Sequence, residues 1–132
     1  MQRLHVSQLI DTNAWIAFFE DSPLLTERAA LAMESGSECW ISVASLWEAA
    51  IKAGLGKLKL PYDLSRDLPR ILEDNSIRVL GIETEDALAV QDLEPLHGDP
   101  FDRMQIIQAR RRGWPVISRD PVFDRYGLTR IW

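Results

Sequence analysis

The chain has 132 residues, 46% of them hydrophobic and 27% charged, which is the composition of a globular protein and a length that suits one domain over residues 1–132. Its net charge of −5 argues against a protein that simply coats nucleic acid, because such proteins are basic. No apolar run approaches the ~18 residues of a membrane span, the apolar N-terminal stretch is too short for a signal peptide, and a single cysteine, Cys39, excludes an internal disulfide and indicates a cytoplasmic protein.

Apolar runs that alternate with helical patterns predict an α/β fold with a parallel sheet. The predicted strands, in chain order, are Leu4–Ile10, Cys39–Ser42, Ile77–Ile82, Pro115–Ser118 and Leu128–Ile131. The predicted helices are Trp15–Glu20, one that opens at Ser22-Pro23 and ends before Gly36, Val43–Ala53, one that begins near Asp67, Thr84–Leu93 and Pro100–Arg112. We expect Trp15, Trp40 and Trp47 in the core of this fold.

Residues with special backbone preferences set the expected helix ends. Proline cannot lie deep in a helix, so the helix near Asp67 is expected to hold Pro69 in its first turn. Thr84 is expected to cap the helix that it begins, and Gly113 to end the last long helix.

Two aspartates follow predicted strands. Asp11 closes the first strand, where it would form an Asx turn or a helix cap. Asp120 follows the fourth strand, where it would cap a helix that starts at Pro121. Each residue therefore has an ordinary structural explanation when it is taken alone.

Two further acids lie near the starts of predicted helices. Asp102 is in the first turn of a helix that Asp99 would cap, and an acid there favours the positive helix end. Ser45-x-x-Glu48 is a capping-box pattern. The neighbours of Glu48 in the sequence are apolar, however, and an apolar setting is costly for an unpaired charge.

The joint placement of these acids predicts a metal site. Parallel sheets bind ligands beyond the carboxyl ends of their strands, at the point where the strand order reverses. Asp11 and Asp120 follow two such ends, and Glu48 and Asp102 lie on helices that can begin at the same edge. Two carboxylates ~6 Å apart repel by roughly 3 kcal/mol at an effective dielectric of ~20, so such a cluster needs a cation or protons. Oxygen ligands select Mg²⁺ or Mn²⁺, and the natural chemistry is attack of metal-activated water on a phosphodiester.

Four segments of the chain carry these acids: LIDTNAW, SVASLWEAAIKAGLGKLKL, LHGDPFDRMQIIQA and VISRDPVFDRYG. In their order and spacing they resemble the PIN-domain ribonucleases, and most closely the VapC-type toxins of bacterial toxin–antitoxin pairs. The resemblance extends over nearly the whole chain. It implies a three-layer α/β/α fold with a parallel sheet of about five strands, Mg²⁺- or Mn²⁺-dependent cleavage of RNA, a homodimer, and inhibition by a cognate antitoxin.

Matched segment by segment, the resemblance places the acids of the family's site on Asp11, Glu48, Asp102 and Asp120. The three aspartates of this set would hold the metal, directly or through water, and Glu48 would complete the site or orient the attacking water. Asn13 falls where the family often has His or Asn, and Ser118 where it usually has Thr. Both would orient the ligands without binding the metal themselves.

Other residues near the acids have two interpretations. Asp99 would support the metal ligands, although a helix cap is favoured because a proline follows it. Lys52 would meet RNA phosphate or pair with Glu48, one helical turn away. Arg103 and Arg119 would hold phosphate or remain solvated.

Two histidines and one tryptophan are further candidates for the site. His5 and His97 lack a second histidine at ligand spacing, so both are expected to be structural or exposed, with His97 merely adjacent to the site. Trp15 follows Asp11 closely, so stacking on a base is an alternative to its expected place in the core.

The same acids would also serve a metal-dependent DNA nuclease or a phosphatase, which a panel of substrates would separate. From another class, the alternative is a non-catalytic interaction module such as a receiver-like signalling domain. A receiver needs an acidic pair before its phosphorylated aspartate and a lysine after a late strand. Here the first strand ends in one acid and no lysine follows Lys59, which disfavours that alternative. The sequence therefore favours a ribonuclease.

Overall fold

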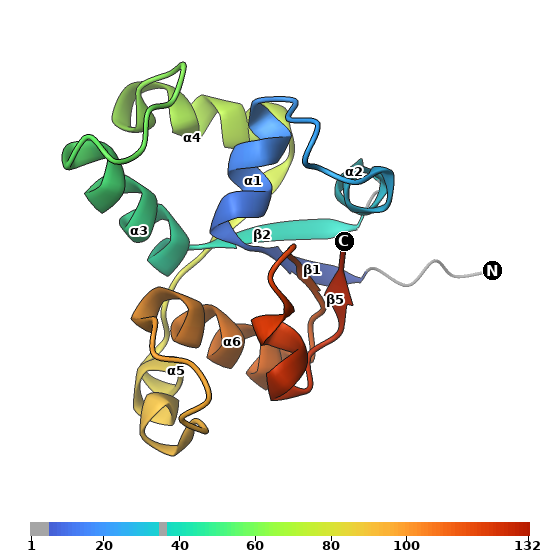
Figure 1. Ribbon diagram of the computed structural model, residues 1–132, viewed down its shortest axis with the longest axis vertical. Coiled ribbons are helices and arrows are strands. Elements are labelled where there is room, and N and C mark those ends of the chain that lie inside the picture. The colour runs from blue at the N-terminus through green and yellow to red at the C-terminus, as the bar shows by residue number, and fades with distance from the viewer. Residues whose placement is uncertain (1–5, 35–36) are drawn as a thin grey trace.

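The computed structural model describes residues 6–34 and 37–132, and its centre is one sheet of five parallel strands (Figure 1). The strands are β1 (Ser7–Ile10), β2 (Glu38–Ser42), β3 (Ile77–Leu80), β4 (Val116–Ile117) and β5 (Arg130–Ile131). Their order is β3-β2-β1-β4-β5, so the direction in which strands are added reverses between β1 and β4. Parallel sheets bind ligands at such a reversal, and here it lies between the two strands that Asp11 and Asp120 follow.

Helices cover both faces of the sheet (Figure 1). They are α1 (Thr12–Phe19), α2 (Glu27–Glu34), α3 (Val43–Gly54), α4 (Leu64–Asp74), α5 (Thr84–Ala89), η1 (Val90–Asp92), α6 (Pro100–Arg112) and η2 (Pro121–Tyr126). Residues of α1 to α4 pack in one hydrophobic cluster, and residues of α6 and η2 pack in another. The predicted three-layer α/β/α fold with a parallel sheet of five strands is confirmed.

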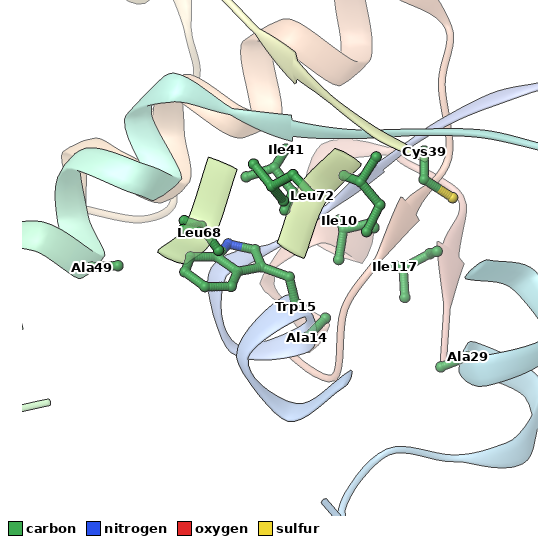
Figure 2. Packing of buried hydrophobic residues seen from close by; sticks show 11 residues of the cluster. Ile10, Ala14, Trp15, Ala29, Cys39, Ile41, Ala49, Leu68, Leu72 and Ile117 are labelled. Atoms are coloured by element: carbon green, nitrogen blue, oxygen red, sulfur yellow. The ribbon is translucent and has the colours of Figure 1, made fainter. Parts of the chain in front are cut away.

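Successive residues of β1 point to opposite faces of the sheet and join different clusters. Ile10 packs in the cluster that contains Trp15 of α1 and Leu68 of α4, all of them at most 5% exposed (Figure 2). Leu9 packs in the other cluster with Ile106 of α6. Because β1 is packed on both faces, the residue at its carboxyl end, Asp11, is held in the interior.

Two helices begin at residues other than those predicted, because local caps decide where they start. α1 begins at Thr12 rather than at Trp15, since the residue that ends β1 caps it. α2 begins at Glu27 rather than at Ser22, since the hydroxyl of Thr26 accepts a hydrogen bond of 3.1 Å from a backbone NH of the first turn. The residues between α1 and α2 form turns instead of helix.

α4 begins at Leu64, so the prediction of a start near Asp67 was wrong. Asp63 caps the helix through a backbone NH three residues later, at 2.9 Å. Pro69 therefore lies in the second turn, where it deprives the carbonyl of Ser65 of its helical partner. Both residues are exposed, so water can take the place of the missing NH.

One predicted cap and one predicted core residue are also corrected. Glu83 caps α5 in a capping box, so Thr84 is the first residue of the helix and not its cap. Trp47 is 59% exposed, although its ring lies edge-on against the ring of Phe101 in α6. Trp15 is fully buried as predicted, and Trp40 is partly buried and packs against the second cluster.

The helix predicted over Thr84–Leu93 ends earlier, since α5 stops at Ala89 and the next three residues form the 3-10 helix η1. Most of the remaining boundaries lie within two residues of those predicted. β3 ends at Leu80, two residues before the predicted end, and Gly113 ends α6 with a φ of 70°. Leu4, His5 and Gly36, which belonged to the first predicted strand and to the end of the second predicted helix, lie outside the described residues. Within residues 6–34 and 37–132, the helices are too short or too polar to cross a membrane.

Candidate active site

Asp11 is a buried carboxylate, 6% exposed, with a partner for each oxygen. Its Oδ1 accepts a hydrogen bond of 2.8 Å from the backbone NH of Ala14, so it caps α1. Its Oδ2 accepts one from the hydroxyl of Ser118. The pKa of this carboxyl is raised from 3.8 to about 6, mainly by burial and also by the charges of Asp102 and Asp120, against the lowering effect of its two hydrogen bonds. A plain helix cap does not require burial beside two more acids.

Ser118 connects Asp11 to Asp120. Its hydroxyl donates to Asp11 and accepts a hydrogen bond of 3.0 Å from the backbone NH of Asp120. Asp120 is exposed and caps η2 through the backbone NH of Val122, at 2.9 Å, so the predicted helix start at Pro121 is confirmed. Ser118 and Asp11 are 107 residues apart in the sequence and become neighbours because β4 pairs with β1.

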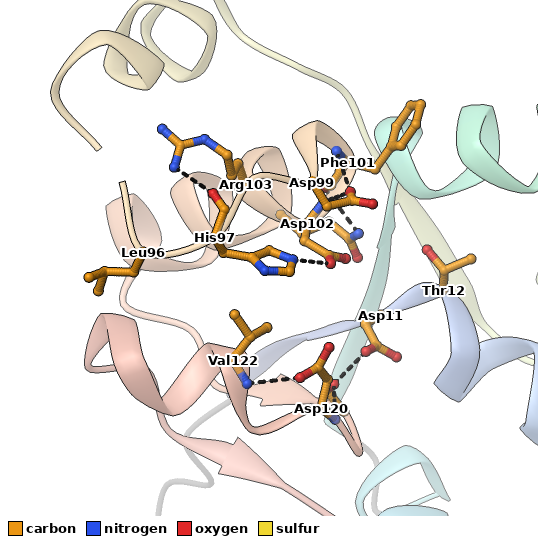
Figure 3. A network of polar contacts seen from close by, with 12 residues as sticks. Asp11, Thr12, Leu96, His97, Asp99, Phe101, Asp102, Arg103, Asp120 and Val122 are labelled. Carbon is orange, nitrogen blue, oxygen red and sulfur yellow. Dashed lines mark hydrogen bonds and ion pairs between the residues drawn. The ribbon is translucent and has the colours of Figure 1, made fainter. Parts of the chain in front are cut away.

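Asp102 comes from α6 and faces Asp11 and Asp120 across the carboxyl edge of the sheet (Figure 3). Nε2 of His97 donates a hydrogen bond of 2.8 Å to Oδ2 of Asp102. His97 therefore contacts a candidate acid directly, whereas the sequence predicted that it would only lie nearby.

Asp99 caps α6, as the sequence favoured. Its Oδ1 accepts hydrogen bonds of 2.9 Å from two backbone NH groups of the first turn. Burial raises the pKa of Asp102; the hydrogen bond from His97 lowers it, and the negative charges of Asp99 and Glu48 raise it. Asp99 thus acts on the candidate site through its charge as well as through the helix start.

Glu48 is 7% exposed, and both of its oxygens are bonded. The hydroxyl of Thr12 donates to Oε1 at 2.7 Å, and Nζ of Lys52 donates to Oε2 at 2.9 Å. The capping-box explanation of this glutamate was wrong, because Ser42 and not Ser45 caps α3. The predicted pair with Lys52 is present.

Ser45 belongs to a buried polar network beside Glu48. Its hydroxyl shares a hydrogen bond of 2.6 Å with Thr12 and accepts one of 2.7 Å from Nε1 of Trp15. Trp15 is fully buried by this arrangement, so its alternative role in base stacking was wrong. The sequence did not predict these contacts of Thr12 and Ser45. The available signal was a hydroxyl next to Asp11 and another one helical turn before Glu48.

Asn13 and Arg119 are exposed and line a cavity of about 460 Å³ together with two of the candidate acids. Apolar side chains, among them Leu24, form part of its wall. Arg103 has a different setting, since its guanidinium donates to three backbone carbonyls of residues 93–97 at 3.0–3.3 Å. Arg119 is therefore available to bind an anion at the carboxyl edge of the sheet, whereas Arg103 holds a loop.

Residues 9–128 match the PIN domain, over most of the chain. The chain belongs to the PIN-domain family. The matched range contains all of the candidate acids, from Asp11 to Asp120. Among curated proteins, none matches this PIN domain in sequence.

Solved structures share the fold of this PIN domain at low sequence identity. VapBC2 from Rickettsia felis, bound to a DNA fragment from its promoter, aligns with a TM-score of 0.68 and 15% identity over 95% of this chain and 97% of that one. DNA-bound VapBC from Salmonella typhimurium aligns with a TM-score of 0.64 and 19% identity over 96% and 97%. A toxin–antitoxin complex from Klebsiella pneumoniae aligns with a TM-score of 0.57 and 19% identity over 86% and 87%.

The carboxylates of this PIN domain are chemically suited to bind a divalent cation. PIN domains generally use such ions. In the part of the chain that the structure describes, no three carboxylate, imidazole or thiol groups surround one point at ligand distance. Burial and mutual repulsion nevertheless raise the pKa values of Asp11 and Asp102, and a cation would relieve both effects. An all-oxygen donor set suits Mg²⁺ or Mn²⁺.

Proposed function

We propose that this PIN domain is a Mg²⁺- or Mn²⁺-dependent endoribonuclease. The observation that carries the proposal is the convergence of three aspartates at the point where the strand order reverses (Figure 3). Asp102 and Asp120 both raise the pKa of Asp11, although the three residues come from α6, the end of β4 and the end of β1. Carboxylates gathered from separate elements in this way are costly for the fold and favour a role in binding a cation.

Each acid has a role that agrees with its contacts. Asp11, Asp102 and Asp120 would hold the cation, directly or through water, and Glu48 would orient the attacking water or complete the site. When bound, the cation activates water and neutralises the charge that develops on the phosphodiester. Ser118 fixes the position of Asp11, since it is bonded to its Oδ2. Arg119, beside the acids on the wall of the cavity, is suited to hold an RNA phosphate, and Asn13 to orient a ligand there.

The test is a cleavage assay on labelled RNA, DNA and a small phosphoester, with Mg²⁺, with Mn²⁺ and with excess EDTA. We expect cleavage of RNA that EDTA abolishes and that Asp102→Asn abolishes. Asp92→Asn is the matched control, because Asp92 is exposed on η1, away from the edge of the sheet. Full activity in EDTA or in Asp102→Asn contradicts the proposal, and cleavage of DNA or of the small phosphoester alone would favour a different hydrolase.

We also propose that this nuclease is the toxin of a toxin–antitoxin pair and that its cognate antitoxin inhibits it. Two similar structures are VapBC complexes and another is a toxin–antitoxin complex. The antitoxin would insert a cation among the acids, and an arginine is best suited because it binds two oxygens of one carboxylate. Lys52 already neutralises Glu48, so the three aspartates are the remaining target. A purified complex whose partner lies remote from Asp11 and Asp120 would contradict this mode of inhibition.

A second copy of this chain is the other proposed partner. The apolar side chains of residues 24–33 and 55–60 supply surface that a second copy can cover. Of these, Leu24, Leu31 and Leu55 are 57–64% exposed. α3 adds an apolar stripe at helical spacing, formed by Val43, Trp47 and Ile51 at 39–59% exposure, which a second copy would cover. We further propose a cytoplasmic location, where RNA and a reduced Cys39 are both expected.

A further inference from the structure

His97 lies in the segment that joins η1 to α6 and makes one side-chain contact with a candidate acid. Its Nε2 is 2.8 Å from Oδ2 of Asp102, and the two side chains are 29% and 24% exposed. A carboxylate only accepts hydrogen bonds when it is ionised, so the imidazole donates from Nε2. Among the hydrogen bonds of the described residues, none reaches Oδ1 of Asp102. His97 therefore binds one oxygen of this carboxylate and leaves the other for a ligand.

The backbone that carries His97 is held by α6. Arg103, the residue after Asp102, donates through Nη1 to the carbonyls of Glu94 and His97, at 3.1 and 3.0 Å. Its Nη2 donates to the carbonyl of Leu93 at 3.3 Å. These three carbonyls lie outside helices and strands, and one guanidinium binds all of them. Arg103 does so from α6, the helix that also carries Asp102.

The same segment is held from the other side by η2. The hydroxyl of Tyr126 donates to the carbonyl of Glu94 at 2.8 Å and accepts a hydrogen bond of 3.2 Å from the backbone NH of Leu96. Nη1 of Arg125 donates to the carbonyl of Leu96 at 2.9 Å. Asp120 caps this η2, so the element that begins at one candidate ligand also anchors the loop that reaches another.

We propose that His97 is a positioning residue for Asp102, and that Arg103 and Tyr126 fix the loop that delivers it. This inference rests on the proposed metal site. A carboxylate on the first turn of a helix can rotate about its side-chain bonds, and a cation gains affinity if that rotation is restricted before binding. Figure 3 shows the imidazole on the side of Asp102 away from Phe101, where it can hold the carboxylate without lying between it and Asp11.

The test compares Mn²⁺ binding to the full chain and its variants by isothermal titration calorimetry. His97→Phe keeps a flat ring but removes the donor, and we expect its Kd for Mn²⁺ to rise about 10- to 100-fold. His97→Gln places an amide NH near the position of Nε2 and should restore most of the affinity. Arg110→Gln is the matched control, because it breaks the pair of Arg110 with Glu94 on the same loop and helix without touching Asp102.

A second measurement separates positioning from general loss of structure. RNA cleavage by His97→Phe should be slow at low Mn²⁺ and recover when Mn²⁺ is raised in proportion to the loss of affinity, whereas a misfolded variant would not recover. If His97→Phe does not fold, as judged by its thermal melt, His97→Ala is measured in its place. A wild-type protein that binds Mn²⁺ no better than Asp102→Asn overturns the proposed function together with this inference. Equal Kd values for wild type and the folded His97 variants overturn this inference alone.

Discussion

The hydroxyl of Thr12 donates a hydrogen bond of 2.7 Å to Oε1 of the buried carboxylate of Glu48. We expect Thr12→Val to destabilise the fold by about 1–3 kcal/mol, because it keeps the shape of the side chain and leaves a buried acceptor without its donor. Urea unfolding measures this change. Thr12→Ser is the control, since it retains the hydroxyl and should lie much closer to wild type. A Thr12→Val protein as stable as wild type would show that water replaces the lost donor.

Burial raises the pKa of Asp11 to about 6, and this predicts how stability depends on pH without metal. The folded state holds the proton of Asp11 more tightly than the unfolded state does. The contribution of Asp11 is therefore fully present below the unfolded pKa of about 4 and is lost as pH rises through about 6. We expect the free energy of unfolding to fall across this window by more in wild type than in Asp11→Asn, which lacks the titrating group. Saturating Mn²⁺ at pH 7 should restore the loss in wild type. Parallel pH profiles of the two proteins would contradict the assignment to Asp11.

Asp120 has a structural role in capping η2 and a proposed role in binding the cation, and two substitutions separate them. Asp120→Asn keeps an oxygen that can accept the hydrogen bond from the NH of Val122, so the metal-free stability should change by less than about 0.5 kcal/mol. Asp120→Ala removes the cap and should cost about 1 kcal/mol. Both should abolish RNA cleavage and reduce the rise in Tm that Mn²⁺ causes. An active Asp120→Asn enzyme would mean that this aspartate is only a cap.

The exposed stripe on α3 predicts how the proposed dimer can be broken. Trp47→Glu places a charge at the centre of the stripe, so sedimentation should show a monomer where wild type is a dimer, at tens of micromolar protein. Leu88→Glu is the matched control, because Leu88 is 70% exposed on α5 and lies outside the stripe. A Trp47→Glu variant that remains dimeric would place the interface on another face.

The sequence predicted most of the fold because its strongest signals are local. Asp11 and Asp120 follow short apolar runs that favour buried strands, and Gly113 ends α6 at a positive φ that favours glycine. Helix starts were less predictable where several residues compete for the cap. Glu83 is preferred to Thr84 at α5 because Asp86 completes a capping box with it, and this is visible only once the backbone is known.

The contacts among the candidate residues depend on tertiary structure and could not be predicted in the same way. His97 reaches Asp102 from the segment that joins η1 to α6. Tyr126, from a distant part of the chain, holds this segment at Glu94 and Leu96, just before the histidine. Trp47 has the spacing of a core residue, yet it stays 59% exposed with its ring edge-on against Phe101 of α6. Glu48 had a convincing local explanation as part of a capping box, and the start of α3 at Val43 removes it.

The pairing of β1 with β4 also determines when a newly made chain can become active. Asp11 leaves the ribosome early, but Ser118, which bonds to it, is translated 107 residues later. The backbone NH of Ser118 in turn donates to the carbonyl of Ile131 in β5, at 3.1 Å. A nascent chain therefore cannot assemble this edge of the sheet before β4 and β5 have been made, and a chain cut short before β4 cannot assemble it at all. The candidate site can therefore form only after nearly all of the PIN domain has left the ribosome.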